Sequence, residues 1–486
     1  MPLHCLMSST SHVFAEVSEF EAALVNDSVP ASSFYNFFDS GDIRLVRVPA
    51  RLDIMGGVAD CSGSNVCEGT LRCGIALGIQ NRSDQFIQLR RLGINHNDAA
   101  HDVSFHLEQL LNNGTLIELQ DLKKIIAQIQ PTAWSVYVLG CIYILLQEKI
   151  LNNLQSGMNI GINSGFPLGA GIGASAALVV ATLQAFNLQF GLNLPAEKIA
   201  SLGQEVEKQI FNSPCGYKDL LTISLGQHNK LMHILCQPGE IRENIVVPED
   251  YEFVGINSML EAESDEAYNL WRMSSMMGQQ IISRDLRNQN LLDKKQLLTN
   301  LCDLTPEDFE NTYRNNLPEK ISGSDFIKEY GKPEAEGLLV DPETIYPVRA
   351  ATAHPIFEND RVIKFIELLK KAKDDTTDAS MKQVGRLMLA SHESYARNCN
   401  LSNEKIDFLV ETIKEVGRKH HLFGAKITSR GAGGTVAFVG KKRHIGDALE
   451  EIVLKYREAT GLTPQIFRGS SPGADEYGNR IYRFEK

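Results

Sequence analysis

The sequence lacks the features that would place the protein in a membrane, in an oxidising compartment or on a nucleic acid. Its longest apolar runs, residues 134–146 and 176–188, fall short of the roughly 20 residues that span a bilayer, so we expect buried helices there. The nine cysteines contain no CxxC pair and are odd in number, which argues against a disulfide framework and a zinc site. A formal net charge of −12 argues against nucleic acid or an anionic membrane as the main partner.

The start of the chain also lacks a basic segment followed by an apolar core, so we expect no secretory leader. Together with the cysteine usage, this favours a reducing, cytoplasmic setting. The composition, with 43% hydrophobic and 22% charged residues over 486 positions, is typical of a globular protein with more than one core. We expect small-molecule partners, no nucleic acid and no membrane, and a monomer or weak dimer.

Periodicity predicts an α+β fold in two lobes. The first part of the chain alternates strand and helix patterns, and helical patterns dominate beyond about residue 260, apart from a hairpin-like pair near residue 430. We divide the chain into an N-terminal arm (1–40), a first domain (41–245) and a second domain (246–486). The segments expected as strands include 44–48, 72–79, 86–90, 158–162, 230–236, 425–429 and 435–439, and those expected as helices include 134–149, 174–189, 195–211 and 360–371.

The most informative stretch is GFPLGAGIGASAAL, residues 165–178. Its glycines precede an apolar helix that begins without a charged residue, so free N–H groups and the helix dipole are available to an anion. The alternative is a Gly-rich turn that only allows close packing of a buried helix. A Walker A loop is excluded because no GxxxxGK[ST] string occurs. A dinucleotide fingerprint fails because no acidic residue occurs between Gly165 and Ala196.

The same loop resembles PxxxGxGxSAA, the phosphate-binding signature of the GHMP small-molecule kinases. Residues 48–63, 211–219 and 424–435 resemble three further motifs of the galactokinase branch, in the right order. The segments ARLDIMGGVADCSGS, HNKLMHILCQPGEI, RAATAHPIFENDRV and TGLTPQIFRGSSPGA are similar to the kinase domain of the arabinokinases within that branch.

This resemblance implies the two-lobed GHMP kinase fold, with a ribosomal-protein-like α/β lobe that binds ATP and a ferredoxin-like, helix-rich α+β lobe. It implies a sugar 1-kinase that uses ATP and Mg²⁺ and acts on a galacto-configured sugar, with L-arabinose as the first choice. A galactokinase, a uronic-acid kinase and a catalytically silent sensor of sugar and ATP remain open alternatives. The residues it assigns to ATP are Pro167, Gly169, Ala170, Gly171, Ile172, Gly173, Ala174, Ser175 and Ala176.

Phosphoryl transfer to a hydroxyl requires a carboxylate and a cation beside the transferred group. By resemblance, Asp219 is the carboxylate that accepts the proton of the sugar hydroxyl or orients that hydroxyl, and Arg51 stabilises the developing charge and steers Asp219. The alternatives are an Asp that only stabilises a helix start and a solvated arginine at a strand end. We assign no role to Lys218.

Glu207 is expected to bind Mg²⁺, and the hydroxyl of Ser175 is expected to bind the metal or the β-phosphate. On a helical wheel Glu207 flanks an apolar stripe beside Gly203 and Ala200, which leaves room for a hydrated cation. The alternatives are that Glu207 is an ordinary glutamate beside the apolar stripe and that Ser175 only occupies the N-terminus of its helix.

The resemblance assigns sugar contacts to Asp60, Gly57, Val58, Gly216 and Tyr268. Galactokinases carry a Glu-His pair at positions 57 and 58, and that pair contacts the C6 hydroxymethyl group. Because unpaired buried polar groups are costly, the loss of both side chains suits a pentose, or a sugar with another group at C6. Further departures from the family pattern are Glu261-Ala262-Glu263 and Ser429-Arg430.

Overall fold

The computed structural model describes residues 4–7, 13–25, 33–92, 101–112, 114–128, 133–151, 154–167, 169–211, 217–260, 265–293, 298–333, 338–431 and 434–485. The chain forms two compact units that each draw on separate stretches. Unit 1 contains Met1–Arg51, Thr70–His228 and Ser470–Lys486, and unit 2 contains Leu52–Gly69 and Asn229–Gly469.

The main sheet of unit 1 has the strand order β1-β17-β2-β3-β8-β4-β5. Strand β17 runs antiparallel to both β1 and β2, and β3 runs antiparallel to β8, whereas β4 and β8 are parallel. The strands are β1 (His4–Met7), β2 (Gly41–Met55), β3 (Asn65–Asn81), β4 (Phe86–Arg91), β5 (His101–His106), β8 (Met158–Ser164) and β17 (Asn479–Phe484), with a small pair of β6 (Leu111–Asn112) and β7 (Thr115–Leu116).

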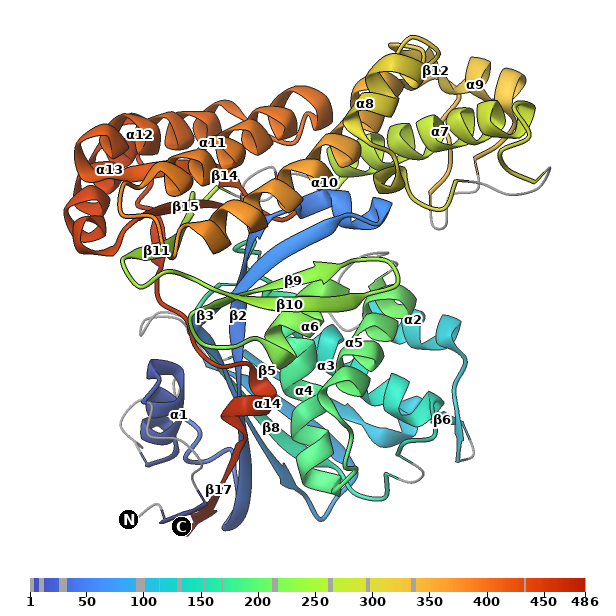
Figure 1. Ribbon diagram of the computed structural model, residues 1–486. Coiled ribbons are helices and arrows are strands. Elements are labelled where there is room, and N and C mark those ends of the chain that lie inside the picture. Colours follow the sequence, from blue (N-terminus) through green and yellow to red (C-terminus); the bar gives the residue numbers. More distant parts are fainter. Residues whose placement is uncertain are drawn as a thin grey trace. The chain divides into compact units, whose positions relative to one another are not determined.

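Helices cover both faces of this sheet, with α3 to α6 on one side and α1 on the other (Figure 1). Helix α4 is buried almost all round, which is typical of a helix in the centre of a core. Helices α3 and α5 pack against it. The helices of unit 1 are α1 (Ala15–Val25), α2 (Leu119–Gln128), α3 (Ala133–Gln147), α4 (Ala174–Phe190), α5 (Ala196–Phe211), α6 (Tyr217–Leu225) and α14 (Ala474–Tyr477), with a 3₁₀ turn at Leu107–Leu110.

An aromatic core joins α1 and the following turn to β2 and β17. Phe20, Phe34 and Phe38 pack together there and are fully buried. Beside them the buried guanidinium of Arg47 donates to Glu16 Oε1 at 2.8 Å and to Ser471 Oγ at 2.7 Å. These bonds fasten α1 and the C-terminal stretch to β2.

Unit 2 contains an antiparallel sheet in the order β14-β15-β11-β16. A hairpin of β9 and β10 pairs with the first residues of β3, Asn65–Gly69. The strands are β9 (Lys230–Leu235), β10 (Glu240–Val246), β11 (Tyr251–Asn257), β12 (Ile321–Ser322), β13 (Ile345–Tyr346), β14 (Leu422–Ile427), β15 (Thr435–Lys441) and β16 (Gln465–Phe467).

The helices of unit 2 enclose two apolar clusters, one against the β14-β15-β11-β16 sheet and one between α7 and α9. They are α7 (Glu266–Asn288), α8 (Pro306–Asp308), α9 (Gly323–Tyr330), α10 (Val348–Lys371), α11 (Ala379–Ser394), α12 (Glu404–His420) and α13 (Ile445–Thr460). Turns of π-helix occur at Phe309–Tyr313 and Tyr395–Cys399, and 3₁₀ turns at Gly57–Ser62, Leu301–Asp303 and Lys442–His444.

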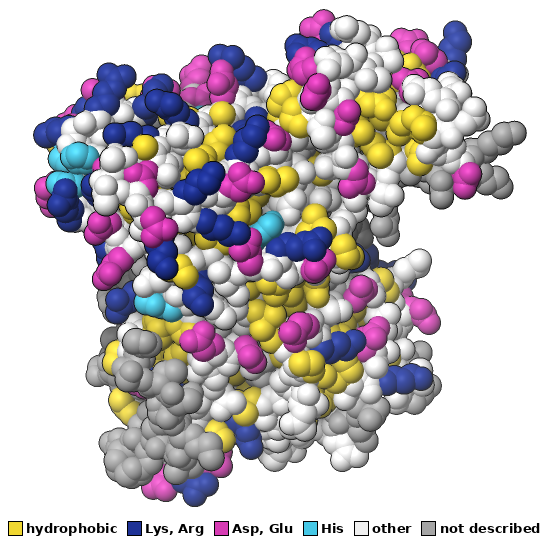
Figure 2. All heavy atoms as spheres, in the orientation of Figure 1, with side chains coloured by type: hydrophobic (Ala, Val, Ile, Leu, Met, Phe, Trp, Pro, Cys, Tyr) yellow, Lys and Arg dark blue, Asp and Glu magenta, His cyan; other side chains and the backbone are white. Residues whose placement is uncertain are grey.

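The prediction of an α+β fold is confirmed, as is the hairpin near residue 430, which is β14 and β15. Among the described residues, no helix combines the length and apolar character that a bilayer crossing requires. Basic and acidic side chains are interspersed over α10 to α13 on the face shown in Figure 2.

Candidate functional site

The predicted phosphate loop leads from β8 into α4 in unit 1. Gly169, Gly171 and Gly173 have φ angles of +84°, +74° and +74°. Ala170 and Ile172, which separate them, are buried. Alternation of left-handed and ordinary residues turns successive N–H groups toward one concave side, an arrangement that binds anions. Gly173 caps α4 without a side-chain hydrogen bond, so no side chain of the cap competes for the first-turn N–H groups.

Arg51 fastens this loop from β2. Its backbone N–H donates to the carbonyl oxygen of Ile172 at 3.0 Å, and its Nη1 donates to that of Gly171 at 3.0 Å. A Cβ at Gly173 would lie 3.0 Å from Arg51 Cγ. The loop therefore needs glycine at position 173 for its φ angle and for its contact with Arg51.

The same guanidinium contacts Asp219 in the first turn of α6. Arg51 Nη2 donates to Asp219 Oδ2 at 2.5 Å, and the Arg51 and Asp219 side chains are 4% and 17% exposed. The other carboxylate oxygen, Oδ1, lies 3.2 Å from Lys218 Nζ. The structure thus brings the two predicted catalytic residues together and adds a buried lysine to which the sequence assigned no role.

The position of Lys218 in the sequence already indicates that it needs an anionic partner. A cation in the first turn of a helix opposes the helix dipole, so a buried lysine there needs a specific anionic partner. Asp219 is that partner in the structure. Two cations therefore contact this carboxylate within unit 1.

The predicted magnesium ligands lie on neighbouring helices of unit 1. Ser175 is half-buried in the first turn of α4, and Glu207 is 7% exposed on α5. Burial, with a smaller contribution from the Glu207 charge, raises the pKa of the Cys141 thiol on α3. Nowhere in the described part of the chain do three His, Cys, Asp or Glu side chains gather as a metal site. One carboxylate and one hydroxyl still fit Mg²⁺, which commonly takes few protein ligands and adds water and phosphate oxygens.

The predicted sugar segment belongs to unit 2. Gly56 and Gly57 have positive φ angles and lead into the 3₁₀ turn at Gly57–Ser62. Asp60 is half-buried, and its Oδ1 accepts from the N–H of Cys61 at 2.7 Å. The side chain of Val58 is buried in the apolar cluster against the sheet. The roles of these residues stay a prediction.

Tyr268, the remaining predicted sugar residue in the described chain, is 5% exposed on α7. The guanidinium of Arg430 lies 5.1 Å from its ring centroid, and Arg430 Nη1 lies 3.4 Å from Asp265 Oδ1. Arg430 is one of the departures from the family pattern, and here it covers a predicted sugar residue. Gly216 and the Glu261-Ala262-Glu263 departure lie outside the described residues.

Two consecutive residues of α10 hold both ends of the sugar segment. Glu358 Oε1 accepts from the N–H of Gly56 at 3.3 Å, and Asn359 Oδ1 accepts from the N–H of Asn65 at 2.9 Å. Glu358 is itself held by Arg361 Nε at 2.7 Å and Ser391 Oγ at 2.6 Å. Sequence reasoning missed this support because the partners are far apart in the chain.

The charges buried around Glu358 predict that acid destabilises unit 2. Burial lowers the pKa of His354 to about 3, whereas Arg361 and other cations, against the effect of burial, lower that of Glu358 to about 2. Both folded-state pKa values lie below the unfolded ones, so the unfolded chain binds more protons and stability falls as the pH falls. Between pH 6.5 and about 3, His354 is protonated in the unfolded chain but neutral in the folded one. We therefore expect this group to lower the free energy of unfolding by about 2 kcal/mol between pH 7 and pH 5.

Thermal melts at pH 7 and pH 5 measure this loss, and His354→Asn provides the comparison because asparagine does not titrate. We expect the melting temperature of the variant to depend less steeply on pH. An equal slope in both proteins would show that His354 is not the responsible group.

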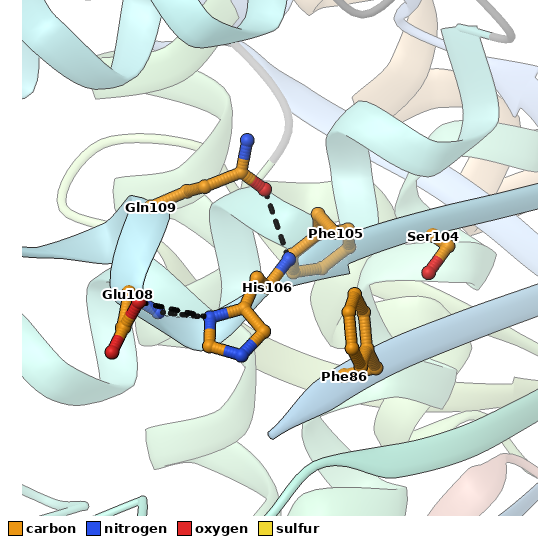
Figure 3. A pocket seen from close by; sticks show the side chains of 6 residues that line it. All are labelled: Phe86, Ser104, Phe105, His106, Glu108 and Gln109. Carbon is orange, nitrogen blue, oxygen red and sulfur yellow. Dashed lines mark hydrogen bonds and ion pairs between the residues drawn. The ribbon is translucent and has the colours of Figure 1, made fainter. Parts of the chain in front are cut away.

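A shallow hollow also lies on the hairpin of β4 and β5, away from the phosphate loop. Phe86, Ser104, Phe105, His106, Glu108 and Gln109 line it (Figure 3). His106 Nδ1 accepts from the N–H of Glu108, and Gln109 Oε1 accepts from the N–H of His106. These bonds cap a 3₁₀ turn, so the side chains of His106 and Gln109 serve local structure.

The loop and its helices identify the class of protein. Residues 136–227, which include the loop, α4, α5 and α6, match the model of the GHMP kinases N terminal domain. The solved structure of Lactococcus lactis galactokinase complexed with galactose has a TM-score of 0.68, at 20% identity over 90% of this chain and 97% of that one. Mevalonate kinase of Methanococcus jannaschii has a TM-score of 0.53, at 16% identity over 88% of this chain and 98% of that one. Residues 136–227 thus resemble the N-terminal domain of the GHMP kinases, and the chain has the fold of these kinases.

Its sequence relatives narrow the class. An L-arabinokinase of Arabidopsis thaliana is 30% identical over 94% of this chain and 48% of its own length. A galactokinase of Thermotoga maritima is 25% identical over 86% of this chain and 95% of its own length. This chain thus spans about half of the L-arabinokinase and matches nearly all of the galactokinase. The two sequence relatives are thus both sugar kinases by name, an L-arabinokinase and a galactokinase.

Proposed function

We propose that the protein transfers the γ-phosphoryl group of ATP to the anomeric hydroxyl of L-arabinose. The observation that carries this proposal is the position of Arg51, whose guanidinium donates both to the Gly171 carbonyl of the loop and to the Asp219 carboxylate. One permanently charged group thereby fixes a phosphate-binding backbone and a proton acceptor at a set separation. The kinase relatives support the same chemistry.

In the proposed mechanism the N–H groups of the 169–173 loop and of the start of α4 hold the ATP phosphates. Asp219 accepts the proton of the sugar hydroxyl as that oxygen bonds to the γ-phosphorus, and ADP leaves. Arg51 and Lys218 hold Asp219 in place before the transfer, and their charge stabilises the negative charge that develops on the transferred group. Ser175 and Glu207 would hold Mg²⁺, which neutralises phosphate charge when bound.

The acceptor assignment rests on Gly57 and Val58. Neither supplies a polar side chain, and Val58 is buried in the apolar cluster. A sugar with a hydroxymethyl group would leave that group without a partner from these two side chains. L-Arabinose, as a pyranose, has the galacto arrangement without the hydroxymethyl group. Asp60 and Tyr268 are the side chains proposed to hold its ring hydroxyls.

ADP release should be measured with L-arabinose, D-galactose, D-glucuronate and D-galacturonate as acceptors. We expect the highest kcat/KM with L-arabinose. A higher value with D-galactose or with a uronic acid would contradict the acceptor assignment and leave the kinase assignment intact. ATP binding without turnover of any of the four sugars would contradict the kinase assignment and indicate a sensor.

A further inference from the structure

Tyr395 occupies the space that a side chain at position 57 would need. A Cβ placed on Gly57 would lie 1.5 Å from the Tyr395 hydroxyl oxygen and 2.7 Å from its Cζ. Both residues belong to unit 2, and Tyr395 is fully buried at the start of the π-helical turn Tyr395–Cys399. A side chain at position 57 and the tyrosine at position 395 therefore exclude each other.

The hydroxyl of Tyr395 is held on both sides. It accepts from the N–H of Val58 at 2.8 Å and donates to the carbonyl oxygen of Ser429 at 2.9 Å. It thus joins the turn that carries Asp60 to the turn between β14 and β15. Burial and the charges of Asp53 and Glu358 raise the pKa of this hydroxyl, so it keeps the proton that it donates to Ser429.

The ring of Tyr395 is fixed as firmly as its hydroxyl. The His354 ring meets it edge-on at 5.1 Å, and Lys426 Nζ lies 5.1 Å from its centroid. A fully buried ring with such neighbours is closely packed and resists displacement. Tyr395 therefore sets the shape of the segment around Gly57 instead of adapting to it.

We propose that Tyr395 is a positioning residue that determines acceptor specificity, because its hydroxyl replaces a side chain at position 57 and fixes the Gly57-Val58 backbone beside Asp60. This inference rests on the proposed sugar kinase function and names the element of unit 2 that selects the acceptor. The selected acceptor is a pyranose without a carbon substituent at C5, since the tyrosine fills the place from which a polar side chain would bind that substituent.

The first test is Tyr395→Phe, which removes one oxygen and leaves the ring in place. The change removes the hydrogen bonds that the hydroxyl makes with the Val58 N–H and the Ser429 carbonyl. We expect KM for L-arabinose to rise about 10-fold, with KM for ATP unchanged within 2-fold. The matched control is Tyr456→Phe, which also removes a buried hydroxyl that donates to a backbone carbonyl of unit 2, that of Ser258 at 3.0 Å. A similar loss of melting temperature with unchanged sugar kinetics is expected for the control.

The second test adds a side chain at position 57 and makes the side chain at position 395 smaller. Gly57→Ser alone clashes with the Tyr395 hydroxyl and should lower kcat/KM for both sugars at least 10-fold. Combined with Tyr395→Leu it gains space, and we expect the ratio of kcat/KM for D-galactose over L-arabinose to rise at least 10-fold relative to the original chain. Each variant is checked by its melting curve and by ATP binding.

An unchanged sugar ratio in the folded double variant, or equal effects of Tyr395→Phe and Tyr456→Phe on sugar KM, would overturn the specificity role. If the double variant does not fold, the comparison of the two Phe variants decides alone. Failure of the proposed function is recognised separately, because the unsubstituted protein would then phosphorylate neither sugar.

Discussion

Replacing Asp219 by asparagine is expected to lower kcat at least 100-fold while ATP still binds. Asparagine has nearly the same shape but accepts no proton from the sugar hydroxyl. It also removes the negative charge that Arg51 contacts at 2.5 Å and Lys218 at 3.2 Å, so two buried cations lose the charge of this carboxylate. A coupled assay of ADP release measures kcat. ATP binding, followed by fluorescence quenching or by calorimetry, shows whether the nucleotide site is intact.

The matched control for this change is Asp447→Asn. Asp447 lies in the first turn of α13, as Asp219 lies in the first turn of α6, but Asp447 is exposed whereas Asp219 is half-buried. Both substitutions remove a favourable interaction with a helix dipole, worth about 0.3–1 kcal/mol. Only the loss at position 219 should affect turnover. A kcat for Asp219→Asn within a factor of three of the original value would refute the catalytic assignment.

The second large effect is expected for Gly173→Ala, which should lower kcat/KM for ATP about 100-fold. Alanine is strained at a φ of +74°, and its methyl group would lie 3.0 Å from Arg51 Cγ and 3.3 Å from Ile223 Cδ1. Arg51 then has to move, and with it the bond to Gly171 and the contact with Asp219. A displacement of about 1 Å in such a group is enough for an effect of this size.

Gly191→Ala at the other end of α4 separates strain from displacement. Gly191 also has a left-handed φ, +59°, but a Cβ there would meet no atom within 4 Å. Both variants therefore pay a similar conformational penalty of about 1 kcal/mol, and we expect the Gly191 variant to keep its kinetics. Equal kinetic losses in both variants would show that the contact with Arg51 is unimportant.

The phosphate loop could be predicted from the sequence because all the residues that indicate it are adjacent in the chain. Glycines at alternate positions before an uncharged apolar helix predict an anion-binding turn, and the three φ angles have the left-handed values that such a turn uses. The contact between Arg51 and Asp219 was expected only through the family resemblance. Nothing in the local pattern relates residues that are 168 positions apart.

The supports of the sugar segment could not be predicted in this way. Val58 and Tyr395 are 337 positions apart, and the glycine at position 57 shows only that a side chain is missing, not what fills its place. Helix α10 was expected to begin near residue 360, but it begins at Val348 and contains Pro355. Proline normally ends a helix, and here it is buried and contacts Cys302, whose Sγ donates to its carbonyl at 3.4 Å. Tertiary packing thus outweighs the local preference, and the helix that carries Glu358 and Asn359 was missed at its beginning.

Each unit is built from separate stretches of the chain, and this affects how the units can be expressed separately. Strand β17 pairs with β1 and β2, and Arg47 on β2 bonds to Ser471, so the last residues belong to the unit that contains the phosphate loop. The hairpin of β9 and β10 pairs with Asn65–Gly69, so a fragment that starts after residue 245 leaves that pairing behind and takes β17 away from its neighbours. No single cut yields both units whole. A separately expressed unit 1 needs its C-terminal stretch rejoined by a linker, as in an inserted or circularly permuted domain.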